Sequence, residues 1–181
     1  MIFFCFLLFF ILQRLVELFV AKRNERKMKQ QGAMEYGKKQ YIVIVFLHIC
    51  FFLSFLSEVM ILHKTLSTLW PPLLITLLLI QGLRIWAMAS LGERWNTKIL
   101  VLPEKDIVMK GPYRYIRHPN YVVVVCELLL IPLFFQAYVT AITFCFCNAY
   151  VLSLRIREEE RALIEMTNYG QRFINISRFT P

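Results

Sequence analysis

The chain has 181 residues, 58% of which are hydrophobic, and its mean hydropathy is +0.55. The apolar residues gather in runs close to the length that spans a bilayer, whereas a soluble domain disperses them. The net charge is +9, but the basic residues lie in short segments between the apolar runs, which argues against a nucleic-acid partner. We therefore expect an all-α, polytopic transmembrane helical bundle that forms a single domain over residues 1–181.

The apolar runs predict about five membrane crossings. They lie at residues 2–20, 41–60, 69–89, 121–134 and 137–154. The last two runs are almost continuous, and one helix across both would be about 51 Å long against a hydrocarbon core of about 30 Å. Because Pro132 and the residues just after it offer a break, we predict a tight helical hairpin there.

The basic residues predict how the bundle is oriented. Residues 21–40 hold seven Lys or Arg, residues 91–120 hold six, and five follow Leu154, whereas the loop at 63–68 holds only Lys64. Lys and Arg are enriched in cytoplasmic loops. We therefore expect a multi-pass protein of the cell membrane with its N-terminus outside and its three basic segments in the cytoplasm.

Five charged residues fall inside the apolar runs, of which Glu58 is near the end of its run and is interpreted as solvated. Arg14 and Glu17 share a helix face and are interpreted as an ion pair that reaches the nearer surface. Arg84 either extends to the headgroups or meets an anion in a cavity. Glu127 is either protonated and hydrogen-bonded, or it faces a polar cavity. The five cysteines also lie in apolar runs, so we expect no metal site and no disulfide.

Two smaller features are predicted outside the apolar runs. Residues 97–102 and 107–110 flank a turn and are expected to pair as a small hairpin. The residues after Leu154 are expected to continue as a charged helix that ends near Gly170.

The most unusual segment is residues 111–121, here called the Arg-His-Pro stretch, which is polar, aromatic and bounded by apolar runs. The predicted topology brings it to the same face as the glutamates at 158–160. The chain has no phosphate-binding glycine motif, no second histidine at metal-ligand spacing and no serine elbow. Carboxylates, arginines, tyrosines and one histidine at a lipid–water boundary suit a cationic or zwitterionic cofactor and an amphiphilic substrate. A solvated helix face is the alternative interpretation of the glutamates.

Two ordered motifs carry a resemblance. The first is Gly111-x-Tyr113 followed by Arg117-His118-Pro119-x-Tyr121, and the second is Arg155-x-x-x-Glu159-Glu160-x-x-Leu163. Together they resemble the isoprenylcysteine carboxyl methyltransferase family of integral membrane methyltransferases, over roughly residue 82 to the C-terminus. The resemblance implies S-adenosyl-L-methionine as cofactor, a lipophilic substrate that enters sideways from the membrane, and a catalytic half at about residues 82–181.

The resemblance also implies residue roles, carried over by position. The cofactor-binding residues would be Tyr113, Arg117, His118, Pro119, Tyr121 and Glu159. Arg84 and Arg155 would hold an anionic acceptor, and Glu160 would bind the cofactor or face the reacting end. The family commonly has glycine where this chain has Val123, so we expect the shape of the pocket to differ locally.

The acceptor is left open between two oxygen chemistries. Bacterial members of the resembled family include O-methyltransferases of long-chain phenolic or pyrone lipids, and the small size of this chain fits such a member. A carboxylate needs only an arginine to place it, whereas a phenol or enol needs a base, either Glu160 or His118. N-methylation of a phospholipid and a non-enzymatic role in membrane assembly are the alternatives. The expected partners are a lipophilic small molecule and membrane lipid, and the oligomeric state is left open.

Overall fold

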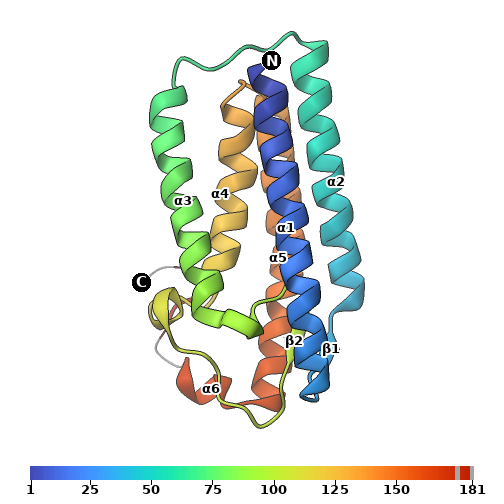
Figure 1. Cartoon of the computed structure of the whole chain (residues 1–181), viewed down its shortest axis with the longest axis vertical. Helices are drawn as coiled ribbons and strands as arrows, with labels where there is room; N and C mark the ends of the chain where they lie inside the picture. The colour runs from blue at the N-terminus through green and yellow to red at the C-terminus, as the bar shows by residue number, and fades with distance from the viewer. Residues whose placement is uncertain (174–175, 180–181) are drawn as a thin grey trace.

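The computed structural model describes residues 1–173 and 176–179. Within this part, five helices run alongside one another in alternating directions and form one elongated bundle (Figure 1). They are α1 (Ile2–Gln30), α2 (Lys38–Ile61), α3 (Trp70–Leu91), α4 (Pro119–Leu133) and α5 (Tyr138–Met166). Four of the described helices, α1, α2, α3 and α5, are long and apolar enough to cross a membrane, and α4 is a shorter apolar helix. The prediction of a polytopic helical bundle is confirmed.

The three basic segments gather at one end of the bundle, here called the basic end (Figure 1). Here α1 and α5 extend beyond their apolar runs, because the charged residues that follow are good helix formers. The prediction that the last helix ends near Gly170 is wrong. It ends at Met166, Thr167 is extended, and Gly170 lies in the separate short helix α6 (Tyr169–Arg172).

The predicted hairpin between α4 and α5 is confirmed at the opposite end. Gln136 has a φ of +55° and reverses the chain. The first turn of α5 has backbone N–H groups without intrahelical partners, and the Glu58 carboxylate of α2 accepts from those of Val139 (3.2 Å) and Thr140 (2.7 Å). This contact ties the start of α5 to the end of α2.

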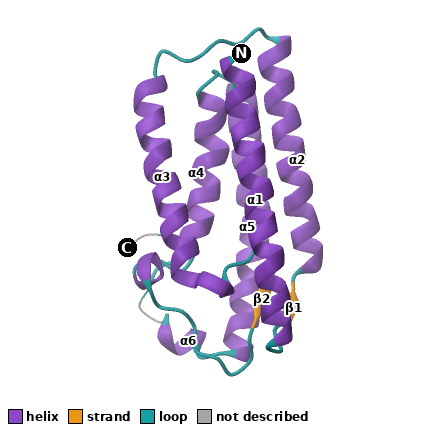
Figure 2. Cartoon of the chain, in the orientation of Figure 1, coloured by secondary structure: helices purple, strands orange, loops and turns teal. Residues whose placement is uncertain are grey.

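The prediction of a small hairpin within residues 97–110 is wrong. The strand β2 (Ile99–Val101) instead pairs antiparallel with β1 (Met34–Tyr36), which connects α1 to α2 (Figure 2). Lys98 fixes this register by binding Glu25 at 2.8 Å and Glu35 at 3.4 Å. The short apolar segment beside a turn indicated a strand but could not identify its partner, which comes from the first third of the chain.

The main apolar core fills the half of the bundle away from the basic end. Its centre is aromatic: the Phe3 ring meets those of Phe55 and Phe135 edge to face, with centroids 5.3 and 5.0 Å apart. Such pairs favour fixed packing of large side chains. The basic half has only a small apolar cluster around β2 and α5, which leaves its interior to polar side chains.

Candidate active site

The end of α3 and the start of α4 position the Arg-His-Pro stretch. Gly111 has a φ of +55°, and a Cβ there would lie 2.0 Å from Ser90 Oγ, so glycine is needed for both conformation and space. It begins a 3₁₀ turn, η2 (Gly111–Arg114). Pro119 then begins α4, where its missing N–H costs no helical hydrogen bond. His118 is held between these two fixed points.

Phe173 and residues 176–178, here called the C-terminal segment, pack against the Arg-His-Pro stretch. The backbone N–H groups of Arg117 and His118 donate to the carbonyl oxygens of Ser177 (3.0 Å) and Arg178 (3.2 Å). The Arg117 guanidinium also donates to the Phe173 carbonyl oxygen at 2.8 Å. Arg117 therefore anchors the C-terminal segment.

Glu160 orients the His118 ring. His118 is 5% exposed, and its Nε2 lies 3.1 Å from Glu160 Oε1. Arg178 donates to both oxygens of Glu160 at 3.0 and 2.5 Å, and the Tyr169 hydroxyl donates to one of them at 3.5 Å. Burial and the Glu160 charge raise the pKa of Tyr169, which keeps its phenol a neutral donor. Because a carboxylate accepts hydrogen bonds, we assign the ring proton to Nε2, which leaves Nδ1 as the basic nitrogen.

Tyr121 links Glu159 to Arg155. Its hydroxyl donates to Glu159 and accepts from Arg155 Nε at 2.8 Å, while its ring stacks on His118 with centroids 5.2 Å apart. Arg155 Nη2 donates to the Thr97 carbonyl oxygen at 2.5 Å, but Nη1 is buried without a partner. Among the described residues, no carboxylate forms an ion pair with this guanidinium, although Arg155 is only 5% exposed. Arg155 is thus a buried cation with one hydrogen-bond donor that has no partner.

A cavity of about 420 Å³ lies beside these residues. Within the described chain, five buried side-chain polar atoms lack a hydrogen-bond partner, and all five belong to residues that line this cavity. They are Arg84 Nε, Trp95 Nε1, Asn120 Oδ1, Asn148 Nδ2 and Arg155 Nη1. Buried polar groups in native proteins are nearly always satisfied. Their concentration around one cavity indicates a binding site for a polar ligand.

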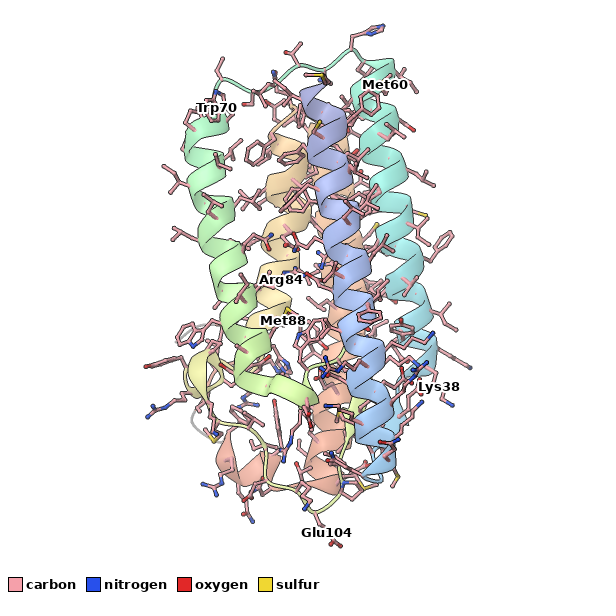
Figure 3. The ribbon with its side chains drawn as sticks, viewed as in Figure 1. Lys38, Met60, Trp70, Arg84, Met88 and Glu104 are labelled. Atoms are coloured by element: carbon pink, nitrogen blue, oxygen red, sulfur yellow. The ribbon has the colours of Figure 1, made fainter. Side chains whose placement is uncertain are left out.

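Arg84 belongs to a second group, the buried charge cluster, which comprises Arg14, Glu17, Arg84 and Glu127. Arg84 and Arg14 each donate to both carboxylates, with Arg14 Nη1 lying 2.8 Å from Glu17. Gln81 donates to Glu127 at 2.6 Å. Figure 3 shows Arg84 at mid-height of the bundle, among the apolar segments. Two cations and two anions thus cancel inside the membrane-spanning part.

The cluster changes two interpretations from the sequence. The prediction that the Arg14–Glu17 pair reaches the surface is wrong, because Glu17 is 6% exposed and also binds Arg84 from another helix. Glu127 is fully buried, accepts hydrogen bonds from Arg14, Gln81 and Arg84, and does not line the cavity. It is hydrogen-bonded as the first alternative expected, but as an anion paired with two arginines and not as a protonated acid. Arg84 borders the cavity with Nε alone, since its terminal nitrogens are occupied by carboxylates.

The predicted site residues divide into two groups in the structure. Those that line the cavity are Arg84, Tyr113, Arg117, His118, Tyr121, Arg155 and Glu159. Pro119 and Glu160 lie behind this lining, and Val123 is fully buried without bordering the cavity. Burial and the Glu159 charge raise the pKa of Tyr113, so it also presents a neutral phenol.

Sequence reasoning missed three polar residues of the lining, Trp95, Asn120 and Asn148. An asparagine inside an apolar run is costly in hydrocarbon, and that cost was a signal for Asn148. Trp95 and Asn120 gave no such signal, because they lie at or outside the ends of apolar runs and their open atoms exist only in three dimensions.

Comparisons with known proteins identify the family of the chain. The family model described as the isoprenylcysteine carboxyl methyltransferase (ICMT) family matches residues 73–165, which contain the Arg-His-Pro stretch and the glutamates of α5. An uncharacterized protein of Bacillus subtilis (strain 168), YpbQ, is 50% identical over 155 residues, which cover 86% of this chain and 92% of that protein. An uncharacterized protein of Haemophilus influenzae (strain ATCC 51907 / DSM 11121 / KW20 / Rd) is 28% identical over 151 residues, 83% of this chain and 88% of its own. No solved structure matches the chain. The chain belongs to the isoprenylcysteine carboxyl methyltransferase family and is a multi-pass membrane methyltransferase.

Proposed function

We propose that the protein transfers a methyl group from S-adenosyl-L-methionine to an oxygen of a lipophilic acceptor at the cytoplasmic face of the cell membrane. The observation that carries the proposal is Arg155, a buried guanidinium that lines the cavity without an ion-pair partner among the described residues and whose Nη1 has no hydrogen-bond partner. A buried charge is expensive unless it is paired. An anionic group of the cofactor or of the acceptor would complete it.

The residues present fit the cofactor. Glu159 supplies a negative charge at the cavity wall for a sulfonium or an ammonium group, and Arg155 and Asn120 supply an open donor and an open acceptor. Aromatic side chains, including Tyr113 and Tyr121, provide faces for a purine and for a cation. When bound, S-adenosyl-L-methionine supplies a methyl group that is already activated, so the protein has mainly to align the acceptor and exclude water.

The opposite wall of the cavity suits an alkyl chain. It is formed by apolar side chains of α1 and α2, three of which, Leu15, Leu18 and Ile49, also face the outside of the bundle. Side chains that border both the cavity and the lipid support a lateral opening between these helices. A lipid could therefore place its head group beside Arg155 while its chain stays in hydrocarbon.

His118 is the base that the geometry favours for a phenolic or enolic acceptor. Its Nδ1 makes no hydrogen bond within the described chain and lies 4.0 Å from Glu159 Oε2, and the ring borders the cavity, whereas Glu160 lies behind it and is held by Arg178. In the proposed mechanism, His118 Nδ1 takes the proton of the acceptor hydroxyl, and the Glu160 carboxylate stabilises the resulting imidazolium. A carboxylate acceptor would need only Arg155.

The orientation rests on charge. The basic end carries all three basic segments, and residues of these segments line part of the cavity, which supports a cytoplasmic site under the positive-inside rule. Single cysteines at Lys64 and Lys105, in a background without the native cysteines, should label differently from outside sealed cells, with only position 64 accessible. Labelling of position 105 alone would reverse the orientation.

N-methylation of an amine is the weaker alternative, because the open donor of Arg155 would repel a cationic amine. The test offers reconstituted protein three acceptors: a prenylcysteine, an alkyl pyrone or phenol, and phosphatidylethanolamine. We expect methylation of an oxygen acceptor and binding of S-adenosylhomocysteine by calorimetry. Arg155→Leu should lower turnover by at least a hundredfold, whereas Arg161→Gln, a control on the exposed face of α5, should not change it.

Three results would count against the proposal. A protein that folds but binds no S-adenosylhomocysteine would instead be an assembly partner. Preferential methylation of phosphatidylethanolamine would make it an N-methyltransferase. Unchanged turnover in Arg155→Leu would remove Arg155 from the site.

A further inference from the structure

We propose that the cavity has a second polar subsite among the membrane-spanning segments, where His48 of α2 and Arg14 of α1 bind a hydroxyl group on the chain of the lipid. The hydroxyl donates to His48 Nε2 and accepts from Arg14 Nε. This inference rests on the proposed function for the identity of that lipid as the methyl acceptor, and it adds that the chain of the lipid is hydroxylated.

His48 supplies the hydrogen-bond acceptor. Its Nδ1 lies 2.9 Å from the carbonyl oxygen of Ile44, which can only accept, so Nδ1 carries the ring proton. The lone pair of the neutral ring is then on Nε2, the nitrogen farther from the helix backbone. Nε2 has no hydrogen-bond partner among the described residues, yet it retains accessible surface. A ligand can therefore reach this nitrogen.

The His48 ring belongs to the face of α2 that lines the cavity. This face includes Tyr41, Val45, His48 and Phe52, whose spacing of four, three and four residues marks one side of a helix. His48 lies in the middle of this face, so its accessible surface borders the cavity. Phe46, by contrast, is exposed on the outside of the bundle and is not part of the lining.

Arg14 supplies the hydrogen-bond donor from α1. It lines the cavity and lies on the interior face of α1 between the buried residues Phe10 and Glu17, so the 22% of its side chain that is accessible borders the cavity. Its two terminal nitrogens bind Glu17 and Glu127. Its Nε has no partner among the described residues and retains accessible surface. Arg14 therefore has one N–H group left for a ligand.

Arg14 and His48 lie beside the route that a lipid chain would take. The charge of Arg14 acts on the His48 ring, which places the two side chains near each other. Their chain neighbours Leu15 and Ile49 belong to the lateral opening inferred between α1 and α2. A chain that leaves the cavity through this opening therefore passes the two unpaired nitrogens.

The packing of α2 on α5 gives the depth of the subsite. The rings of Phe51 and Phe144 meet with centroids 5.6 Å apart, and the two helices are antiparallel (Figure 1). His48, three residues before Phe51, is therefore level with position 147 of α5, which is eight residues from Arg155. Eight residues correspond to about 12 Å along the helix axis. A lipid whose head group lies at Arg155 thus brings a carbon about 12 Å along its chain to His48.

The two unpaired nitrogens together specify a hydroxyl. His48 Nε2 can only accept and Arg14 Nε can only donate, whereas a hydroxyl does both through one oxygen. A ketone at the same carbon accepts from Arg14 but gives His48 no donor, and a methylene group leaves both side chains unpaired. Sites that bind a substrate hydroxyl reject analogues that lack it, because their own polar groups then stay unpaired. The subsite should therefore select an alcohol at this depth.

The experiment uses alkyl phenols of one chain length, which carry an alcohol, a ketone or a methylene group about 12 Å from the ring. A fourth phenol carries its alcohol at the end of the chain. Binding of each phenol to the cofactor-free protein is measured by calorimetry in detergent, together with turnover and with binding of S-adenosylhomocysteine.

The variants change His48 and leave Arg14 in place, because Arg14 also holds two carboxylates of the buried charge cluster. His48→Phe keeps a ring but removes the acceptor. His48→Gln keeps an acceptor, since its side-chain oxygen extends about as far as Nε2. Phe46→Leu is the matched control on the outside of α2.

We expect the parent and Phe46→Leu to bind the mid-chain alcohol at least tenfold more tightly than the methylene compound or the end-of-chain alcohol, with the ketone between them. His48→Phe should lose this preference, keep its affinity for the methylene compound within threefold, and bind S-adenosylhomocysteine normally. His48→Gln should keep part of the preference.

Three results would overturn the inference. A parent without a preference for the mid-chain alcohol would mean that water satisfies both side chains. A preference that survives His48→Phe would place the alcohol elsewhere in the cavity. Loss of S-adenosylhomocysteine binding in His48→Phe would assign His48 to the cofactor. If the protein binds the mid-chain alcohol through His48 but methylates no acceptor, the subsite stands and the proposed function fails.

Discussion

Two buried arginines of this bundle have nearly the same exposure and opposite surroundings. Arg84 is 3% exposed and donates to the carboxylates of Glu17 and Glu127, whereas Arg155 is 5% exposed and has no carboxylate partner in the described chain. Each has one nitrogen without a hydrogen-bond partner, but Arg84 belongs to a neutral group of charges and Arg155 has no counter-ion. The comparison teaches that burial of a charge does not identify a site, and that a missing counter-ion does.

The largest expected loss of stability follows from removing one charged side chain of the buried charge cluster. Arg84→Leu or Glu127→Leu alone should each lower the free energy of unfolding by about 3–5 kcal/mol, because a buried charge is left without its partner. The double variant should be far less destabilised, since Arg14 and Glu17 remain paired at 2.8 Å. SDS-induced unfolding in mixed micelles, followed by circular dichroism, measures all three.

Arg155→Leu serves as the matched control for this cycle. It removes a cation that has no ion pair to leave behind, so it should cost no more than about 2 kcal/mol for its hydrogen bonds to Tyr121 and Thr97. If Arg155→Leu destabilised the protein as strongly as Arg84→Leu, the distinction between an ion-paired arginine and one without a counter-ion would fail. Additive losses in the Arg84/Glu127 double variant would contradict it as well.

The same distinction explains what the sequence could predict. Apolar runs, basic segments and Pro132 were enough to place the helices and the hairpin, because these signals act locally and depend on length, charge and backbone geometry. The proximity of His118 to Glu160 followed from topology, since both segments were expected at one end of the bundle. Local rules therefore predicted which segments come together at the basic end.

What the sequence could not supply was the choice of partners. Arg84 lies 67 residues from Glu17 and 43 from Glu127, and nothing in the apolar runs marks these as a set. For the same reason β2 was assigned the wrong strand partner. Asn148 gave a signal as an amide inside an apolar run, but its lack of a hydrogen-bond partner is a property of the packed structure and not of the residue type.

A smaller loss of stability should come from a change in the loop at Gly111, which supports the Arg-His-Pro stretch. The buried charge cluster is held by three helices, but the position of His118 depends on Gly111, which packs against the end of α3. Gly111→Ala combines a positive φ with overlap at Ser90, so it should cost roughly 2–4 kcal/mol. We also expect S-adenosylhomocysteine affinity to fall at least tenfold, as measured by calorimetry, because the Arg-His-Pro stretch must shift.

Gly32→Ala is the control for Gly111→Ala. Gly32 also has a positive φ, of +90°, but a Cβ there meets nothing within 4 Å. It should show only the backbone cost of about 1–2 kcal/mol and no change in ligand affinity. Equal losses of affinity in both variants would show that the close approach at Ser90 does not position the site.

The smallest expected effect concerns an arginine–carboxylate pair that is in contact with water. Arg178 binds both oxygens of Glu160, as Arg84 binds two carboxylates, yet its side chain is 50% exposed. The hydrogen bond to Glu160 raises the pKa of Arg178, and against the opposing effect of burial the hydrogen bonds from His118 and Arg178 lower the pKa of Glu160 to about 2, so the pair is ionised near neutral pH. Exposed ion pairs contribute up to about 1 kcal/mol, and salt screens them.

Arg178→Gln should therefore change the free energy of unfolding by less than about 1 kcal/mol. It should keep the affinity for S-adenosylhomocysteine within threefold, and it should remove part of the salt dependence of stability between low and high ionic strength. A loss as large as that of Arg84→Leu would mean that the C-terminal segment excludes water from Glu160 much more completely than its exposure indicates, and that the two groups differ in partners but not in solvation.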